Sequence, residues 1–210
     1  HAEPIMVKGY AESEVFADQG SLTVRISEKG DDNGEAYEKA GDSLERVRAL
    51  VDEVLGEDLE MVELSSSLSE TKKLNEKGNR TNEIEYVTAT RSLRVNSGKV
   101  EDLDRLSRKL YDLNGEGIRL TLSGPDFFVS NLDEVKIDLM KRATKNGRDR
   151  AEIMAKSSGE KLGSLVSARQ GVIQITKPNS TRTSSYGIYD TETIEKVVKL
   201  VVTLEFKIGG

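Results

Sequence analysis

The clearest pattern in this 210-residue chain is the alternation of its last segment. Apolar side chains occupy every second position there, at Val198, Leu200, Val202, Leu204, Phe206 and Ile208. Lys199, Thr203 and Glu205 lie between them. Because successive side chains of a strand point to opposite faces, this pattern predicts a strand with one buried face and one face in water. Such a strand is typical of an antiparallel sheet.

The rest of the chain predicts the order ββαββαβαββ, which belongs to the α+β class. We expect a mixed, mainly antiparallel sheet with helices packed on one face, because the strands do not alternate strictly with helices. The predicted elements are a hairpin over 5–29 with its turn at 17–20, a helix over 35–55, strands over 60–70 and 84–96, a helix over 100–113, a strand over 118–122 ended by Gly124-Pro125, a helix over 132–157, a strand over 165–175 and the final strand.

The helix over 132–157 carries a ridge of small residues at every fourth position. The ridge consists of Ala143, Gly147, Ala151 and Ala155. Small side chains let another backbone approach closely, so we expect this ridge to pack tightly on a sheet or a neighbouring helix. Asn131 and Glu134 have the spacing of a capping box at the start of this helix.

The length of the chain fits one large domain or two small lobes. We expect a single domain over 5–208 and treat residues 1–4 as an N-terminal remnant. If the domain divides, the expected sub-lobes are 5–70 with 190–208, and 84–176. No apolar run approaches the ~20 residues of a membrane-spanning helix. The start at His1 without a methionine has two explanations, a removed N-terminal segment or a remnant of cloning, and a lost signal peptide or N-terminal anchor is the one we expect.

The composition argues against several classes of partner and site. The net charge is −6, and Lys and Arg are scattered among acidic residues, so we expect no nucleic-acid partner and no electrostatic grip on anionic membranes. There is no cysteine, and the only histidine is His1. A thiolate nucleophile, a Ser-His-Asp triad and a two-His metal site are therefore all excluded within one chain. We expect no catalytic residues, no metal and no cofactor.

One acidic segment resembles part of a calcium loop. It runs from Asp31 to Glu35, but Asp42 and Ser43 stand where the closing bidentate glutamate is needed. A turn followed by a helix start explains this segment better.

The polar loop over 177–190 is the best candidate for an interaction site. Tyr186 and Tyr189 offer flat contact area at modest entropic cost, and Arg182 lies on the same loop. The alternative interpretation is a mobile connector without a partner.

Three segments together resemble the SIMPL-domain family. They are VKGYAESEVFADQGSLTVRIS, DLMKRATKNGRDRAEIMAKSSGEKLGSL and EKVVKLVVTLEFKI. In that family a long helix with recurring alanines leads into a Gly-x-x-Leu-Gly turn, which Gly159, Leu162 and Gly163 match here. Ala17-Asp18 departs from the Pro-Asp of many members. The resemblance implies an α+β fold, export to the bacterial periplasm or envelope, self-assembly and, for some members, a link to stress tolerance. It implies no catalytic residue.

Three functions remain open from the sequence. The first is a non-catalytic, exported binding or scaffold module that forms homo-oligomers, for which an unknown protein partner is also conceivable. The second is a cryptic hydrolase that uses carboxylates or a recruited metal. The third is a signalling adaptor, which rests on the family name alone.

Overall fold

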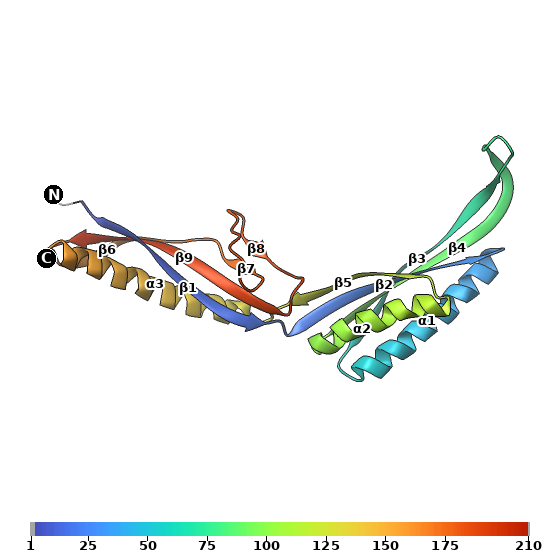
Figure 1. Cartoon of the computed structure of the whole chain (residues 1–210), viewed down its shortest axis with the longest axis horizontal. Helices are drawn as coiled ribbons and strands as arrows, with labels where there is room; N and C mark the ends of the chain where they lie inside the picture. The colour runs from blue at the N-terminus through green and yellow to red at the C-terminus, as the bar shows by residue number, and fades with distance from the viewer. Residues whose placement is uncertain (1–2, 210) are drawn as a thin grey trace. The chain divides into compact units, whose positions relative to one another are not determined.

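The structure is a computed structural model that describes residues 3–209, and it divides the chain into two compact units (Figure 1). The terminal unit contains the chain up to Ala17 and from Val129 onward, and the central unit is Asp18–Phe128. These bounds differ from the expected sub-lobes 5–70 with 190–208 and 84–176. The chain passes between the units at 17–18 and at 128–129. The first crossing lies between two strands, and the second lies between a strand and the helix that follows it. His1 and Ala2 of the expected N-terminal remnant lie outside the described residues.

The central unit is a four-stranded antiparallel sheet with helices on one face (Figure 1). Its strands, in the spatial order β3-β4-β2-β5, are β3 (Glu60–Leu74), β4 (Arg80–Ser97), β2 (Gln19–Gly30) and β5 (Leu120–Phe128). Two α-helices, α1 (Asn33–Leu55) and α2 (Val100–Asp112), and the short 3-10 helix η1 (Leu113–Glu116) complete the unit. Leu22, Val24 and Ile26 of β2 are fully buried beneath the helices. This face forms the core, and the opposite face of the central sheet is open.

The terminal unit is a five-stranded sheet with one helix on one face (Figure 1). Its elements are β1 (Ile5–Phe16), α3 (Leu132–Ser157), β6 (Leu162–Gln170), β7 (Gln174–Thr176), β8 (Ile188–Tyr189) and β9 (Glu195–Ile208). β9 lies at the centre, with β1 antiparallel along its whole length on one side and β6 and β7 on the other. Val198, Leu200 and Leu204 of β9 are buried beneath α3. The alternation at the end of the sequence therefore marks the central strand of this sheet.

The predicted hairpin over 5–29 is wrong, although both strands exist. β1 pairs with β9 in the terminal sheet, whereas β2 pairs with β4 and β5 in the central sheet. At the predicted turn, the Ala17 N–H donates to Ile194 O and the Asp18 N–H donates to Phe128 O. These two bonds lead the chain into different sheets. Alternating hydrophobicity identifies a strand but carries no information about its partner.

Other predicted elements shift in smaller ways. The α+β class with mainly antiparallel strands is confirmed, but the strands form two sheets, and four strands rather than two follow α3. β5 continues through Gly124-Pro125 instead of ending there, and Gly124 has a positive φ of 95°. The expected strand over 165–175 is interrupted between Gln170 and Gln174, so it becomes β6 and β7.

The helix ends agree closely with the sequence, with one exception. Asp32 accepts a hydrogen bond from the Glu35 N–H (2.8 Å) as the N-cap of α1, as expected for a turn and helix start. Gly56 ends α1 with a positive φ of 64°. α3 begins after Asn131, but the Asn131 side chain makes no cap hydrogen bond, so the predicted capping box is not formed. None of the helices within residues 3–209 has a stretch long and apolar enough to cross a bilayer.

Candidate functional site

The small-residue ridge of α3 packs onto the terminal sheet. Ala143, Gly147, Ala151 and Ala155 are all buried. Gly9 of β1 faces the ridge so closely that a Cβ at this position would lie 2.0 Å from Ala143 O and 2.7 Å from Gly147 N. The ridge therefore lets the helix backbone touch the strand backbone, and it is covered within its own unit.

Side chains of α3 also cover the free edge of β1. The Tyr10 N–H donates to Asn146 Oδ1 (2.9 Å), and the guanidinium groups of Arg142 and Arg150 donate to Glu12 O (3.0 Å) and Lys8 O (3.3 Å). These three side chains recur every four residues along one line of the helix. Because they occupy the backbone groups of an edge strand, they block the pairing of β1 with another strand.

The face of the terminal sheet opposite α3 is open, and we call it the open face of the terminal sheet. Met6 and Tyr10 of β1 and Val201 of β9 are 62%, 40% and 39% exposed there, and Tyr10 lies opposite Val201 in the register. The surrounding charges have both signs, at Lys8, Glu12, Glu205 and Lys207. This face therefore combines exposed apolar side chains with balanced charge.

Tyr10 on this face combines an apolar ring with a hydroxyl that is already hydrogen-bonded. Its hydroxyl donates a hydrogen bond to the Glu12 carboxylate. Partial burial, together with this hydrogen bond and the negative charge of Glu12, raises the pKa of Tyr10 to about 12. The phenol therefore stays protonated at neutral pH and offers an apolar ring whose polar end already has a partner.

The loop over 177–187 lies at one end of the same face and is fixed at two places. Lys199 Nζ donates to Ser180 O (2.5 Å), while the Gln174 side chain donates to Ser184 O (2.7 Å) and accepts from the Ser184 N–H (3.3 Å). Gln174 and Lys199 stand opposite each other in the strand register, on the open face. The loop therefore covers that end of the face and leaves the end with Tyr10 and Val201 uncovered.

The three candidate residues of this loop line two neighbouring recesses that share Ile188. Tyr186, which is 96% exposed, and Tyr189 line a recess of about 340 Å³ together with Val172 and Ile188. Arg182 lines a smaller recess of about 170 Å³ with Thr176 and Asp190. The structure therefore does not bring Arg182 and the two tyrosines together in one recess.

Two buried polar residues near this loop, Thr176 and Lys196, could not be predicted from the sequence pattern. Thr176 is buried in the smaller recess, and its Oγ1 atom has no hydrogen-bond partner among residues 3–209. Lys196 is fully buried, with its Nζ 2.9 Å from Asp190 Oδ2 and 2.8 Å from Asp190 O. Lys196 occupies a core position of the alternating strand, where the sequence pattern predicts an apolar side chain.

The surroundings of Asp190 lower the pKa of its carboxyl group. Burial acts to raise the pKa of Asp190, but hydrogen bonds from Lys196 and Thr193 and the positive charge of Lys196 outweigh burial, so the pKa lies below its ordinary value. The Asp190 carboxylate therefore stays ionised at neutral pH, and its contact with Lys196 holds the end of the 177–190 loop against β9.

The described acidic residues form no evident metal centre. Within residues 3–209, no three side chains among His, Cys, Asp and Glu are grouped so that they could hold a metal ion. His1 lies outside this part of the chain.

Comparison with known proteins places the chain in one family of unknown function. The family model described as "SIMPL: Protein of unknown function (DUF541)" matches residues 5–205. No curated protein matches the chain.

Solved structures match the chain only weakly. A protein assigned as an amidohydrolase/peptidase from Burkholderia cenocepacia shares 11% identity over 55% of this chain and 30% of its own, with a TM-score of 0.34. A hydantoinase/carbamoylase family amidase from Burkholderia ambifaria shares 12% identity over 53% of this chain and 30% of its own, with a TM-score of 0.33. A protein assigned as an aminohydrolase from methicillin resistant Staphylococcus aureus shares 10% identity over 70% of this chain and 41% of its own, with a TM-score of 0.32. The chain thus spans less than half the length of each of these proteins.

Proposed function

The chain belongs to the SIMPL family, and we propose that it is a non-catalytic binding or scaffold module that assembles with copies of itself in the bacterial cell envelope. Export through a removed signal peptide or an N-terminal anchor, and a role in stress tolerance, belong to the same proposal and rest on the family resemblance.

The observation that carries the assembly proposal is the open face of the terminal sheet. Met6, Tyr10 and Val201 expose apolar surface in a chain whose charged residues make up 32% of the sequence. An exposed apolar patch with a polar rim is typical of an interface between proteins. The loop at 177–187 covers only one end of the face, so the patch stays available.

We propose a second copy of the same chain as the occupant of this face. In a two-fold interface the same patch of each copy faces the other copy. Positive side chains of one copy must therefore meet negative side chains of the other. Lys8 and Lys207 next to Glu12 and Glu205 supply both signs on one face. Assembly through the β1 edge is disfavoured, because Arg142, Asn146 and Arg150 already cover it.

The variant Val201→Lys tests this proposal. The aliphatic part of the new lysine side chain still covers the strand. Its ammonium group, however, has to be buried without a partner if a second copy packs there. Size-exclusion chromatography with light scattering at micromolar concentration should show a multimer for the wild type and a shift toward monomer for Val201→Lys. The matched control is Ile153→Lys, because Ile153 is 65% exposed on α3, which covers the other face of the sheet.

Three results would contradict the assembly proposal. These are a wild type that is monomeric at every concentration, a Val201→Lys variant that assembles like the wild type, and an Ile153→Lys variant that loses assembly equally. The envelope part is tested by fractionating cells that make the full-length natural protein, which we expect in the envelope or periplasmic fraction. Recovery in the cytoplasmic fraction alone would contradict it. The alternatives of a hydrolase and a signalling adaptor gain no specific observation from the described residues.

A further inference from the structure

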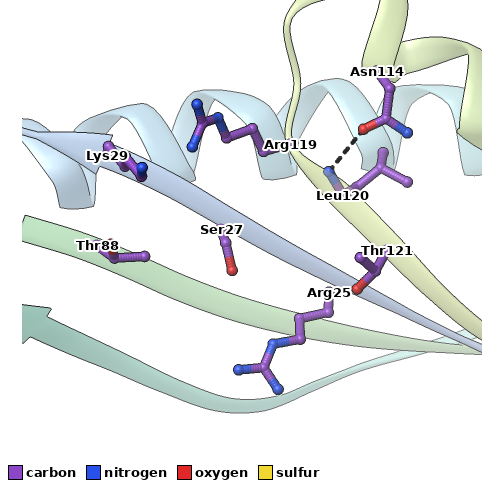
Figure 2. A pocket seen from close by; sticks show the side chains of 8 residues that line it. All are labelled: Arg25, Ser27, Lys29, Thr88, Asn114, Arg119, Leu120 and Thr121. Atoms are coloured by element: carbon purple, nitrogen blue, oxygen red, sulfur yellow. Dashed lines mark hydrogen bonds between the residues drawn. The ribbon is translucent and has the colours of Figure 1, made fainter.

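A pocket of about 220 Å³ lies on the central unit (Figure 2). Three neighbouring strands and the segment before β5 line it, mostly with side chains of the open face of the central sheet. The lining residues are Arg25, Ser27, Lys29, Thr88, Asn114, Arg119, Leu120 and Thr121. We call it the Arg25–Arg119 pocket.

The charge of this pocket differs from that of the whole chain. Arg25, Lys29 and Arg119 line it, and no carboxylate does, although the net charge of the chain is −6. The side chains of Arg25 and Arg119 have no hydrogen bond or ion pair within residues 3–209, and Lys29 Nζ lies 4.1 Å from the centre of the Tyr86 ring. Lys29 also hydrogen-bonds to the Tyr86 side chain, but within residues 3–209 none of the three cations forms an ion pair with a carboxylate. An anion in the pocket therefore does not have to displace an acidic side chain from them.

Three side chains with hydroxyl groups line the pocket together with these cations. Figure 2 shows Ser27 between the side chains of Arg119 and Arg25, with Thr88 and Thr121 on the neighbouring strands. Ser27 Oγ is 3.2 Å from Thr90 Oγ1, whereas the hydroxyls of Thr88 and Thr121 have no partner among the described residues. Hydroxyl donors beside arginine and lysine are the groups that contact phosphate oxygens in proteins.

The backbone around Arg119 is fixed by three hydrogen bonds. The Arg119 N–H donates to Glu28 Oε1 (2.7 Å), Arg119 O accepts from the Ser27 N–H (3.0 Å), and the Leu120 N–H donates to Asn114 Oδ1 (3.2 Å). Glu28 is buried on the helix-covered face of the sheet, so its carboxylate serves this backbone contact and does not line the pocket. The backbone position of Arg119 is therefore set before any ligand arrives, so only its exposed side chain has to be ordered on binding.

We propose that the Arg25–Arg119 pocket binds a phosphate monoester. Arginine presents a planar fork that matches two phosphate oxygens, lysine adds a point charge, and the threonine hydroxyls donate to the remaining oxygens. Pockets for drug-sized molecules occupy about 300–1,000 Å³, so this smaller pocket suits a phosphate with a small organic group attached. The ligand is either a free phosphorylated small molecule or the headgroup of a phospholipid. This site lies in the central unit and does not depend on the assembly proposed for the terminal unit.

Binding is tested first with wild-type protein at constant ionic strength, adjusted with NaCl so that screening does not change. The probes are inorganic phosphate, glycerol 3-phosphate, and vesicles of phosphatidylcholine with or without phosphatidic acid. We expect saturable binding of glycerol 3-phosphate with a Kd of about 1 mM or lower, and amide shifts in ¹H–¹⁵N spectra confined to residues near 25–29 and 114–121. Binding to phosphatidic acid vesicles identifies a lipid headgroup as the source, and binding to glycerol 3-phosphate without vesicle binding identifies a free ligand.

The variant Arg25→Gln/Arg119→Gln should weaken binding about tenfold or more, because each charged hydrogen bond contributes strongly. Arg94→Gln is the matched control, because Arg94 is exposed on the same face of the same sheet but does not line the pocket. It should change the Kd less than about twofold. The proposal is overturned if no probe binds saturably, if amide shifts spread over the whole surface, or if Arg94→Gln weakens binding as much as the double variant.

Discussion

The two units are built alike but differ in what they leave in contact with water. Each is a mainly antiparallel sheet with helices on one face only. The open face of the terminal sheet carries exposed apolar side chains, such as Met6 and Val201, among charges of both signs. Around the Arg25–Arg119 pocket, the open face of the central sheet carries hydroxyls and cations, and no carboxylate lines the pocket.

In each unit, the helix-covered face of the sheet stabilises the fold, whereas the open face is the surface that other molecules can reach. In both units the covered face packs against helices, and its side chains are mostly apolar, with Glu28 and Lys196 as buried charged exceptions. The open faces are free of that constraint, and we propose that their different chemistry serves different contacts with other molecules. The terminal face suits a second protein surface, and the central face suits a small anion.

The buried ion pair between Lys196 and Asp190 lies in the terminal unit, and its removal gives the largest expected effect on stability. Lys196→Ala leaves the Asp190 carboxylate buried without its partner, which costs roughly 3–5 kcal/mol of the free energy of unfolding. Urea unfolding of the terminal unit measures this loss. Lys177→Ala is the control: it removes a cation paired with Glu192 in an exposed ion pair, where the side chains are 50% and 74% exposed, and should leave the unfolding curve unchanged. Equal curves for Lys196→Ala and the wild type would show that the pair has no structural role.

Close backbone packing at Gly9 is the next test, because only the terminal unit relies on a single α-helix. In Gly9→Ala the new methyl group meets the α3 backbone at Ala143 O, so the helix has to move away, at a cost of about 2–3 kcal/mol. Ala151→Leu on the same ridge should cost about 1–3 kcal/mol. Thermal unfolding followed by circular dichroism measures both losses.

Gly115→Ala in the central unit is the matched control for this pair, because a Cβ there meets nothing within 4 Å. It should leave the melting temperature unchanged or raise it slightly. If Gly9→Ala behaves like Gly115→Ala, α3 does not depend on direct backbone contact with β1.

The covered edge of β1 gives a smaller effect. Asn146→Ala removes the acceptor for the Tyr10 N–H and should cost about 1 kcal/mol. The newly unpaired backbone should also increase light scattering on heating, because an open strand edge pairs with other chains. Arg148→Ala on the same helix removes only an exposed contact with Glu152 and should scatter like the wild type. Identical scattering by all three proteins would show that the edge needs no cover.

The smallest expected effect is the change in stability at acid pH that comes from Asp190. Because the folded state holds the pKa of Asp190 below its ordinary value, the stability from this group is fully present above that ordinary value, and it is lost as the pH falls through the folded pKa. The difference in stability between the wild type and Asp190→Asn should therefore shrink as the pH falls below about 4. A constant difference across this range would mean that the charge of Asp190 contributes nothing.

The sequence predicts the local elements well and their partners poorly. The helix over 132–157 and the last strand follow from periodicity, because each is set by which of its own residues are buried. The partner of β1 is β9, nearly the whole chain away, and no local pattern records that pairing. The pocket residues Arg25 and Arg119 escape detection for the same reason, since register alone brings β2 and the segment before β5 together. Tyr186 is the exception, because an aromatic residue in a polar loop is visible in the sequence and is highly exposed in the structure.

Hydrogen–deuterium exchange by mass spectrometry tests the division of tasks between the two open faces most directly. The wild-type protein is compared at high and low protein concentration, and with and without glycerol 3-phosphate. We expect dilution to raise exchange in peptides from β1 and β9, and the phosphate ester to lower exchange in peptides covering 22–30 and 114–121. Changes in the same peptides under both treatments, or no change under either, would show that the two open faces do not bind different partners.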